Sequence, residues 1–135
     1  MIFDYYNQQK IDDQYIHDSD FEGFSYDNGR GRVTTICVNR FEKIKNTLIF
    51  HEVFGVETQA CKFWGGGNSV CDIWIGEGTL IRKLLEDFSH NSNGSWYDPS
   101  EELKQCIEVC LQVNSGDMLT IVCKQLEWVK EEIEP

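Results

Sequence analysis

The sequence predicts a mainly β (α+β) fold: an antiparallel meander that forms a barrel or a sandwich, with one or two short helices. Three observations predict it. Apolar and β-branched residues alternate with polar ones along most of the chain, turn sequences rich in Asn, Gly and Asp separate these segments, and one segment stands out by its helical spacing. The length of 135 residues predicts a single domain, residues 1–135.

The first regular elements are predicted to form a β-hairpin. After a polar, acidic lead-in of about twenty residues, taken as an extended arm, apolar residues alternate through 21–26, and 32–38 is rich in β-branched residues. The sequence DNGRG at 27–31 lies between them, and Asn and Gly accept the positive φ of a tight turn. Residues 40–46 are basic and polar and are expected to form a connection.

A long apolar segment follows at residues 47–63, which is too long for one regular strand. Gly55 predicts a bulge or bend that divides it into two strands. The sequence WGGGNS at 64–69 predicts the next turn. Residues 70–75 predict a strand with Cys71, Ile73 and Ile75 on one face.

The apolar spacing becomes helical in residues 79–88, with Thr79 as a candidate N-cap, and this helix is expected to cover a sheet. Asp98 and Pro99 predict a further helical turn near Glu101. Residues 104–113 fit either a helix or a strand. The turn sequence NSGD at 114–117 and the β-branched run after it favour a hairpin of 104–113 with 118–128, followed by a frayed acidic tail.

The charge balance disfavours two classes of partner. The chain has 23 acidic and 12 basic residues, a formal net charge of −11, which repels phosphate backbones and anionic lipid headgroups. We therefore expect neither nucleic-acid nor membrane binding. The opening sequence MIFDYYNQQKIDDQ lacks the features of a signal peptide, and no stretch reaches the length of a membrane span, so a cytoplasmic location is expected.

The six cysteines are expected to be reduced thiols, several of them inside apolar runs. Two pairs could instead act as metal ligands or form disulfides: Cys61 with Cys71, which flank the glycine loop, and Cys106 with Cys110. Neither has the spacing of a closed zinc site, so no metal and no cofactor is predicted.

No motif specifies a reaction. The glycine loop lies between two strands, whereas phosphate-binding loops precede a helix and often carry a Lys. His51 with Cys61 is the best pair for nucleophilic catalysis, but no accompanying signature supports it. No catalytic residue is predicted, and the balance is against an enzyme.

Two resemblances bear on identity. The stretch LIFHEV at 48–53, followed by CKFWG at 61–65 and by the strand pair around Ser115-Gly116-Asp117, resembles a pattern in small uncharacterised bacterial proteins. It covers about the last two-thirds of the chain and implies no particular activity. In size and acidity the chain also resembles immunity proteins of bacterial toxin systems, a similarity of composition that identifies no residue.

The leading functional hypothesis is a non-enzymatic binding protein, of the kind that masks a basic toxin. Acidic residues dominate the first 27 residues, where Lys10 is the single cation, and acidic surfaces with aromatic side chains suit recognition of a basic cleft. The predicted partner-binding residues are Tyr5, Tyr6, Asp12, Asp13, Asp18 and Asp20. A plainer explanation is that net negative charge only keeps the protein soluble.

The alternative is a small-molecule-binding β-barrel or an uncharacterised enzyme. Its pocket would be the barrel interior or the sheet face under the helix at 79–88, lined by Trp64, Trp74 and Trp96. The same tryptophans would otherwise be core residues or cross-strand pairs. A homo-oligomer is also left open.

Overall fold

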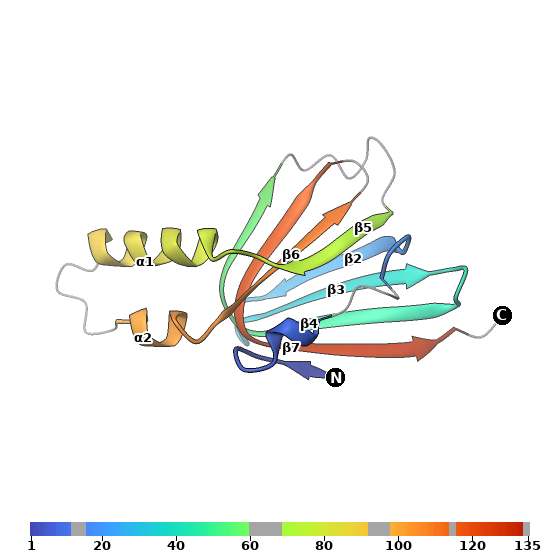
Figure 1. The fold of residues 1–135 in the computed structure, drawn as a ribbon, viewed down its shortest axis with the longest axis horizontal. Helices are drawn as coiled ribbons and strands as arrows, with labels where there is room; N and C mark the ends of the chain where they lie inside the picture. Colours follow the sequence, from blue (N-terminus) through green and yellow to red (C-terminus); the bar gives the residue numbers. More distant parts are fainter. Residues whose placement is uncertain (12–15, 60–68, 92–97, 114–115, 134–135) are drawn as a thin grey trace.

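The computed structural model describes residues 1–11, 16–59, 69–91, 98–113 and 116–133. Within them, seven strands form one antiparallel sheet, and two α-helices lie beside its bend (Figure 1). The elements are β1 (Ile2–Phe3), the 3-10 turn η1 (Gln8–Lys10), β2 (Asp20–Asp27), β3 (Arg32–Asn39), β4 (Ile44–Gln59), β5 (Val70–Ile75), α1 (Thr79–Asn91), α2 (Ser100–Leu103), β6 (Ile107–Val113) and β7 (Met118–Glu132). The predicted fold class is confirmed.

The strand order is β2-β3-β4-β7-β6-β5, and β1 also pairs with β7. The predicted hairpins, β2 with β3 and β6 with β7, both form with antiparallel register. β7 therefore lies between β4 and β6 and joins the two hairpins. The N-terminal segment expected to be an extended arm is partly ordered by this strand, because Ile2 pairs with Glu127 and Phe3 with Leu126.

β4 differs from the prediction in two ways: where it begins, and whether it is divided at Gly55. It begins at Ile44, inside the segment expected to be a connection, and it continues as one strand through the expected division. Gly55 does mark a bulge, because the register with β7 shifts between Val53 and Gly55. β3 lies beside only the first half of β4, up to the pair Val33–Phe50, and the second half bends away with β7 (Figure 1).

The prediction that the acidic tail frays is wrong for residues 129–132. β7 runs to Glu132 and pairs with the start of β4, through Val129–Thr47 and Glu132–Ile44. The polar ends of these two strands order each other, because each supplies the other's backbone hydrogen bonds.

The sheet curls but does not close into a barrel. Its two edge strands, β2 and β5, meet at one end through a bridge between Asp20 and Ser69. Two backbone hydrogen bonds accompany the bridge, from Val70 N to Ser19 O at 2.6 Å and from Asp18 N to Val70 O at 2.9 Å.

The inner face of the curled sheet carries the main hydrophobic core. Alternate residues of each strand point to this face, as strand geometry requires. The core includes Val33, Leu48, Phe50, Val109, Leu111, Ile121, Leu126 and Trp128. The Trp128 indole donates a hydrogen bond of 2.8 Å to Asn46 Oδ1, so the buried ring's polar group and the buried amide satisfy each other.

The outer face carries a second, smaller core beneath the helices. Leu80 of α1, Leu103 of α2, Cys106 and Val122 are buried together there, with Leu84 packed against them. The predicted helix at 79–88 is confirmed and extends to Asn91, and the predicted helical turn is α2. At the start of α2, Asp98 Oδ1 accepts a hydrogen bond of 3.0 Å from Ser100 N.

Candidate functional site

The aromatic residues predicted to bind a partner are exposed. Tyr5 and Tyr6 are 45% and 77% exposed in the turn after β1, and their rings meet edge to face at 5.5 Å. The carboxylate of Asp4 orders this turn by accepting hydrogen bonds from Tyr6 N at 2.9 Å and Asn7 N at 3.3 Å. The two rings are therefore presented by a fixed turn.

The predicted acidic residues divide into three cases. Asp12 and Asp13 lie outside the described residues. Asp18 is exposed, has a positive φ of 63°, and lies 3.7 Å from His17 Nε2. Asp20 is bound by an arginine, so its charge is partly neutralised. Two of the predicted acidic residues are therefore described, Asp18 and Asp20, and of these Asp18 presents an exposed carboxylate.

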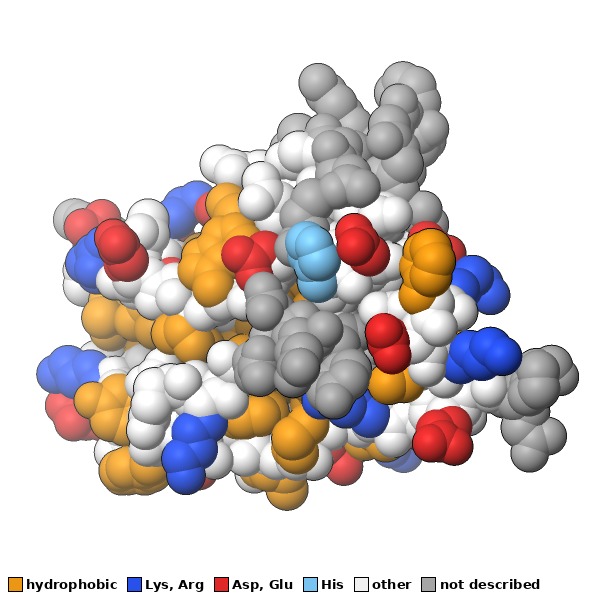
Figure 2. Space-filling view, turned by 45° about the vertical axis from the view of Figure 1, so that its right-hand side comes forward, with side chains coloured by type: hydrophobic (Ala, Val, Ile, Leu, Met, Phe, Trp, Pro, Cys, Tyr) orange, Lys and Arg blue, Asp and Glu red, His pale blue; other side chains and the backbone are white. Residues whose placement is uncertain are grey.

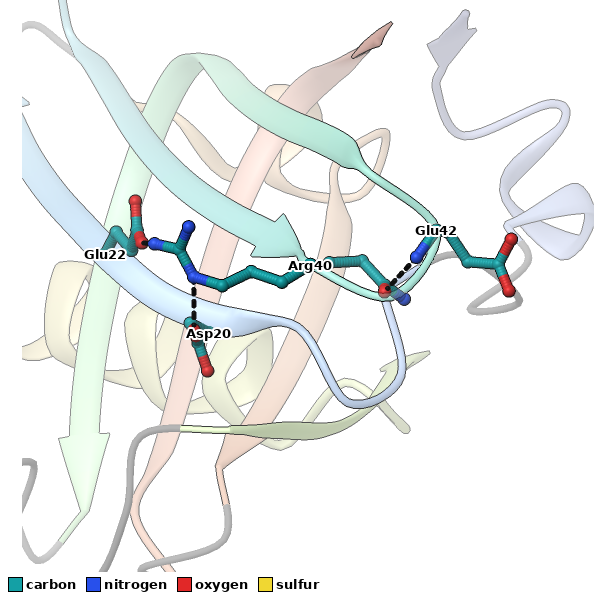
Figure 3. Close-up of polar contacts among 5 residues, drawn as sticks. Asp20, Glu22, Arg40 and Glu42 are labelled. Carbon is teal, nitrogen blue, oxygen red and sulfur yellow. Dashed lines mark hydrogen bonds and ion pairs between the residues drawn. The ribbon is translucent and has the colours of Figure 1, made fainter. Parts of the chain in front are cut away.

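Arg40 forms an ion-pair clamp with two carboxylates of β2 (Figure 3). Its Nε lies 3.1 Å from Asp20 Oδ2, and its terminal nitrogen binds Glu22 Oε1. These contacts, led by the hydrogen bond to Asp20, raise the pKa of the guanidinium. All three side chains are partly exposed, so the clamp holds the turn after β3 to β2 with a small free-energy contribution.

The turn that carries this arginine also presents a hydrophobic side chain. Phe41 is 92% exposed. The neighbouring Asn39 fixes the turn: its Oδ1 accepts a hydrogen bond from Glu42 N at 3.0 Å (Figure 3), and its Nδ2 donates one to His17 O at 3.2 Å.

Charged side chains are interspersed on the face shown in Figure 2. Acidic groups stand singly among basic, polar and hydrophobic side chains, without one continuous acidic patch on that view. The net charge of −11 therefore acts on this face as a diffuse field, with local neutral and hydrophobic areas inside it.

A hydrophobic slot opens between β2 and the second half of β4. One cavity, of about 270 Å³, is lined by Phe21, Glu22, Gly23, Phe24, Thr58 and Leu119. A second, of about 340 Å³, is lined by Phe24, Tyr26, Val53, Phe54, Gly55 and Val56. Phe24 lines both cavities, and we call the two together the β2–β4 slot. No pattern in the sequence predicts this slot.

A third cavity, of about 250 Å³, lies at the start of α1 on the outer face. It corresponds to the predicted pocket under the helix, and Trp74 lines it as expected, whereas Trp64 and Trp96 lie outside the described residues. Its other lining side chains include Glu57, Glu108, Cys110 and Thr120.

Glu108 has a structural task in this cavity. Its buried carboxylate accepts hydrogen bonds from Leu80 N at 2.7 Å, Gly78 N at 2.9 Å and Ile81 N at 3.0 Å. It therefore satisfies the unpaired N–H groups at the start of α1 in place of the predicted cap Thr79. A Cβ on Gly76 would lie 2.3 Å from Glu108 Oε2, so this approach requires glycine.

The described residues give little support for nucleophilic catalysis. His51 Nε2 lies 3.0 Å from Glu127 Oε1 across β4 and β7, and its suggested partner Cys61 is outside the described residues. Within the described part of the chain, no group of three His, Cys, Asp or Glu residues could hold a metal ion.

Four described cysteines, Cys37, Cys106, Cys110 and Cys123, are buried free thiols. Burial raises the pKa of Cys37 to about 12 and of Cys106 to about 11, and it also raises the pKa values of Cys110 and Cys123. These thiols are protonated at neutral pH and are poor nucleophiles. Cys106 instead donates to Glu102 O at 3.3 Å, and Cys110 lies 3.9 Å from Thr120 Oγ1.

Comparisons with known proteins add no family. The sequence matches no protein-family model, and a search of curated proteins gives no match. In the described part of the chain, no helix is both long and apolar enough to cross a membrane.

Proposed function

We propose that this chain is a non-enzymatic binding protein whose partner is a basic protein, as an immunity protein masks a basic toxin. The observation that carries the proposal is that large hydrophobic side chains stand exposed in a strongly acidic molecule. Among the residues that the structure describes, the most exposed aromatic side chains are Phe41, Tyr6, Tyr26, Tyr5 and Phe24.

Exposed aromatic rings and net charge serve different parts of binding. A ring that becomes buried in a partner contributes much of the affinity, whereas a diffuse negative field raises the rate at which a cationic partner arrives. Tyr5 and Tyr6 suit the first role because a hydrogen-bonded turn already orders them. Less conformational entropy is then lost on binding.

The test is a binding measurement with the basic protein encoded nearest to this chain's gene. We expect the affinity to fall about tenfold or more between about 0.05 M and about 0.3 M salt, because added ions screen the attraction. Replacing both tyrosines, Tyr5→Ala with Tyr6→Ala, should weaken binding about tenfold or more, and the exposed neighbour Gln9→Ala is the matched control. A salt-independent affinity, or no measurable binding, would contradict the proposal.

A small-molecule-binding function is the second candidate, and the β2–β4 slot favours it. The slot is concave and mainly apolar, with few polar groups, as ligand sites usually are. A ligand there would not exclude a protein partner at the tyrosine turn.

A further inference from the structure

We propose that the β2–β4 slot binds a small, largely apolar molecule that is neutral or cationic. The first observation is that residues of the inner face are exposed there. Phe24 and Tyr26 pair across the strands with Thr35 and Val33, both of which are fully buried on the inner face. Cross-strand partners share a face, so these two aromatic side chains also point inward. They are nevertheless 45% and 53% exposed.

The second half of β4 also has a residue that points to the inner face and is nevertheless exposed. Val56 pairs with Ile121, which is buried in the main core, yet Val56 is 38% exposed. Leu119 of β7, a main-core residue that pairs with Thr58 of β4, also lines the slot. Among the described residues, the slot is therefore a part of the inner face without cover, and its wall is continuous with the core.

The opening follows from the path of β4. β3 stays with β4 up to Phe50, and in the described part of the chain the last backbone hydrogen bond on that side runs from Val53 N to Gly31 O at 2.8 Å. The bulge at Val53–Gly55 then turns β4 away with β7. Among the strands that the structure describes, none pairs with β4 beyond this point on the side facing β2.

A buried hydroxyl on the same face also lacks a partner. Thr35 lies between its cross-strand neighbours Phe24 and Leu48, is fully buried, and its Oγ1 forms no hydrogen bond. A buried hydroxyl without a partner is costly. Thr35 itself lines neither cavity of the slot, so its hydroxyl bears on the packing of this face and assigns no ligand group.

The charges around the slot determine the ligand class. Residues 20–27 of β2 contain Asp20, Glu22 and Asp27 and neither Lys nor Arg. Glu22 itself lines the slot. Arg40 pairs with Asp20 and Glu22, and Arg30 lies 3.8 Å from Asp27, so the local charge is partly offset within the net charge of −11 of the whole chain. A carboxylate ligand such as a fatty acid would be repelled, whereas an alcohol or an amine would be accepted.

The experiment uses the whole chain and the neutral fluorescent probe N-phenyl-1-naphthylamine. We expect saturable binding, displaced by octanol and octylamine at lower concentrations than by octanoate. The double variant Phe24→Ser with Val56→Ser should bind the probe about tenfold or more weakly, because it removes two apolar contacts of the slot. Phe41→Ser, at an exposed ring that lines neither cavity of the slot, should bind as the unchanged protein does.

Thermal unfolding would establish that the variants fold, which their partial exposure leads us to expect. No saturable binding, equal binding by the double variant, or strongest displacement by octanoate would each overturn the proposal. Binding of a basic protein is measured separately and is tested through Tyr5 and Tyr6, which line neither cavity of the slot, so the failure of either proposal leaves the other testable.

Discussion

The two faces of the second half of β4 reverse the usual arrangement of a curled sheet. Its outer face, which would ordinarily meet water, is partly covered: Gly55 lies under Leu84 of α1, and the half-exposed Glu57 pairs with Lys83 of the same helix at 3.1 Å. Its inner face, which would ordinarily be core, is open at Val56.

This difference shows that burial is set by what lies opposite a strand, more than by the strand's own alternation. The helices cover one face because Glu108 holds the start of α1 against β6. The other face stays open because β3 ends its pairing with β4 before the bulge. The four tests below are expected to separate covered positions from open ones.

The largest expected effect concerns thiol reactivity on the covered faces. Burial raises the pKa of Cys37 from 9.0 to about 12 and of Cys106 from 9.0 to about 11. At pH 8 the thiolate populations should then be about a thousandfold and about a hundredfold lower than in the unfolded chain. Alkylation by iodoacetamide, followed residue by residue by mass spectrometry in buffer and in urea, would measure this.

The same shift has a consequence for stability against pH. Because the folded pKa of Cys37 is raised, its stabilising contribution is fully present below pH 9.0 and is lost as the pH rises toward about 12. Equal alkylation rates in buffer and in urea would contradict both statements.

The second test compares two inward-facing phenylalanines. Phe50 is 1% exposed and Phe24 is 45% exposed. Phe50→Ala should lower the free energy of unfolding by about 4 kcal/mol, whereas Phe24→Ala should lower it by about 1 kcal/mol or less, because the second ring leaves no closed cavity. Urea denaturation measures both values. Similar losses would mean that the β2–β4 slot is covered in solution.

The third test removes the acceptor that holds α1. Glu108→Ala leaves the N–H groups of Gly78, Leu80 and Ile81 without their carboxylate partner. The expected loss is about 3 kcal/mol, since these are hydrogen bonds to a charged group at a helix start. Glu101→Ala, an exposed acid of α2, is the control and should change stability by less than about 0.5 kcal/mol. A loss no greater than that of Glu101→Ala would show that the Glu108 carboxylate does not hold the start of α1.

The smallest effect concerns the space between β4 and α1. A Cβ on Gly55 would lie 2.7 Å from Leu84 Cδ1, so Gly55→Ala should destabilise the protein by about 1 kcal/mol as the leucine shifts. The double variant with Leu84→Ala should lose less than the sum of the two single losses. If the loss of unfolding free energy of the double variant equals the sum of the two single losses, Leu84 of α1 is not in close contact with β4 at Gly55.

Local alternation and turn chemistry predicted most of the strands correctly. Residues 70–75 match β5 as predicted, and the hairpin around Asp27–Gly31 and the helix from Thr79 need little adjustment at their ends. The apolar spacing and turn residues that specify these elements lie within the segments themselves, so their own residues are sufficient to predict them.

The segments that were predicted wrongly are ordered by contacts with residues far away in the sequence. Asn46 looks like part of a polar connection, but its buried amide binds the indole of Trp128. Lys45 pairs across the strands with Glu131, so two polar strand ends order each other. Composition within either segment gives no sign of the other.

The candidate site was predicted less well than the fold for the same reason. Phe24 and Tyr26 have the pattern of core residues, and their exposure depends on the path of β4. One signal was visible: Glu108 is the lone charge in the otherwise apolar run IEVCL, which is unusual for a strand buried on both faces. Its partner at the start of α1 could not be identified from the sequence.

The central place of β7 has a consequence for how the chain assembles. β2, β3 and β4 form one group and β5 and β6 another, and the sheet joins them through β7, the last strand along the chain. During synthesis, β4 and β6 therefore expose unsatisfied backbone edges until residues 118–132 leave the ribosome. Such edges are prone to aggregation, and pairings between residues far apart in sequence form slowly. A nascent chain stalled before residue 118 should need a chaperone, and release of β7 would complete the sheet in one cooperative step.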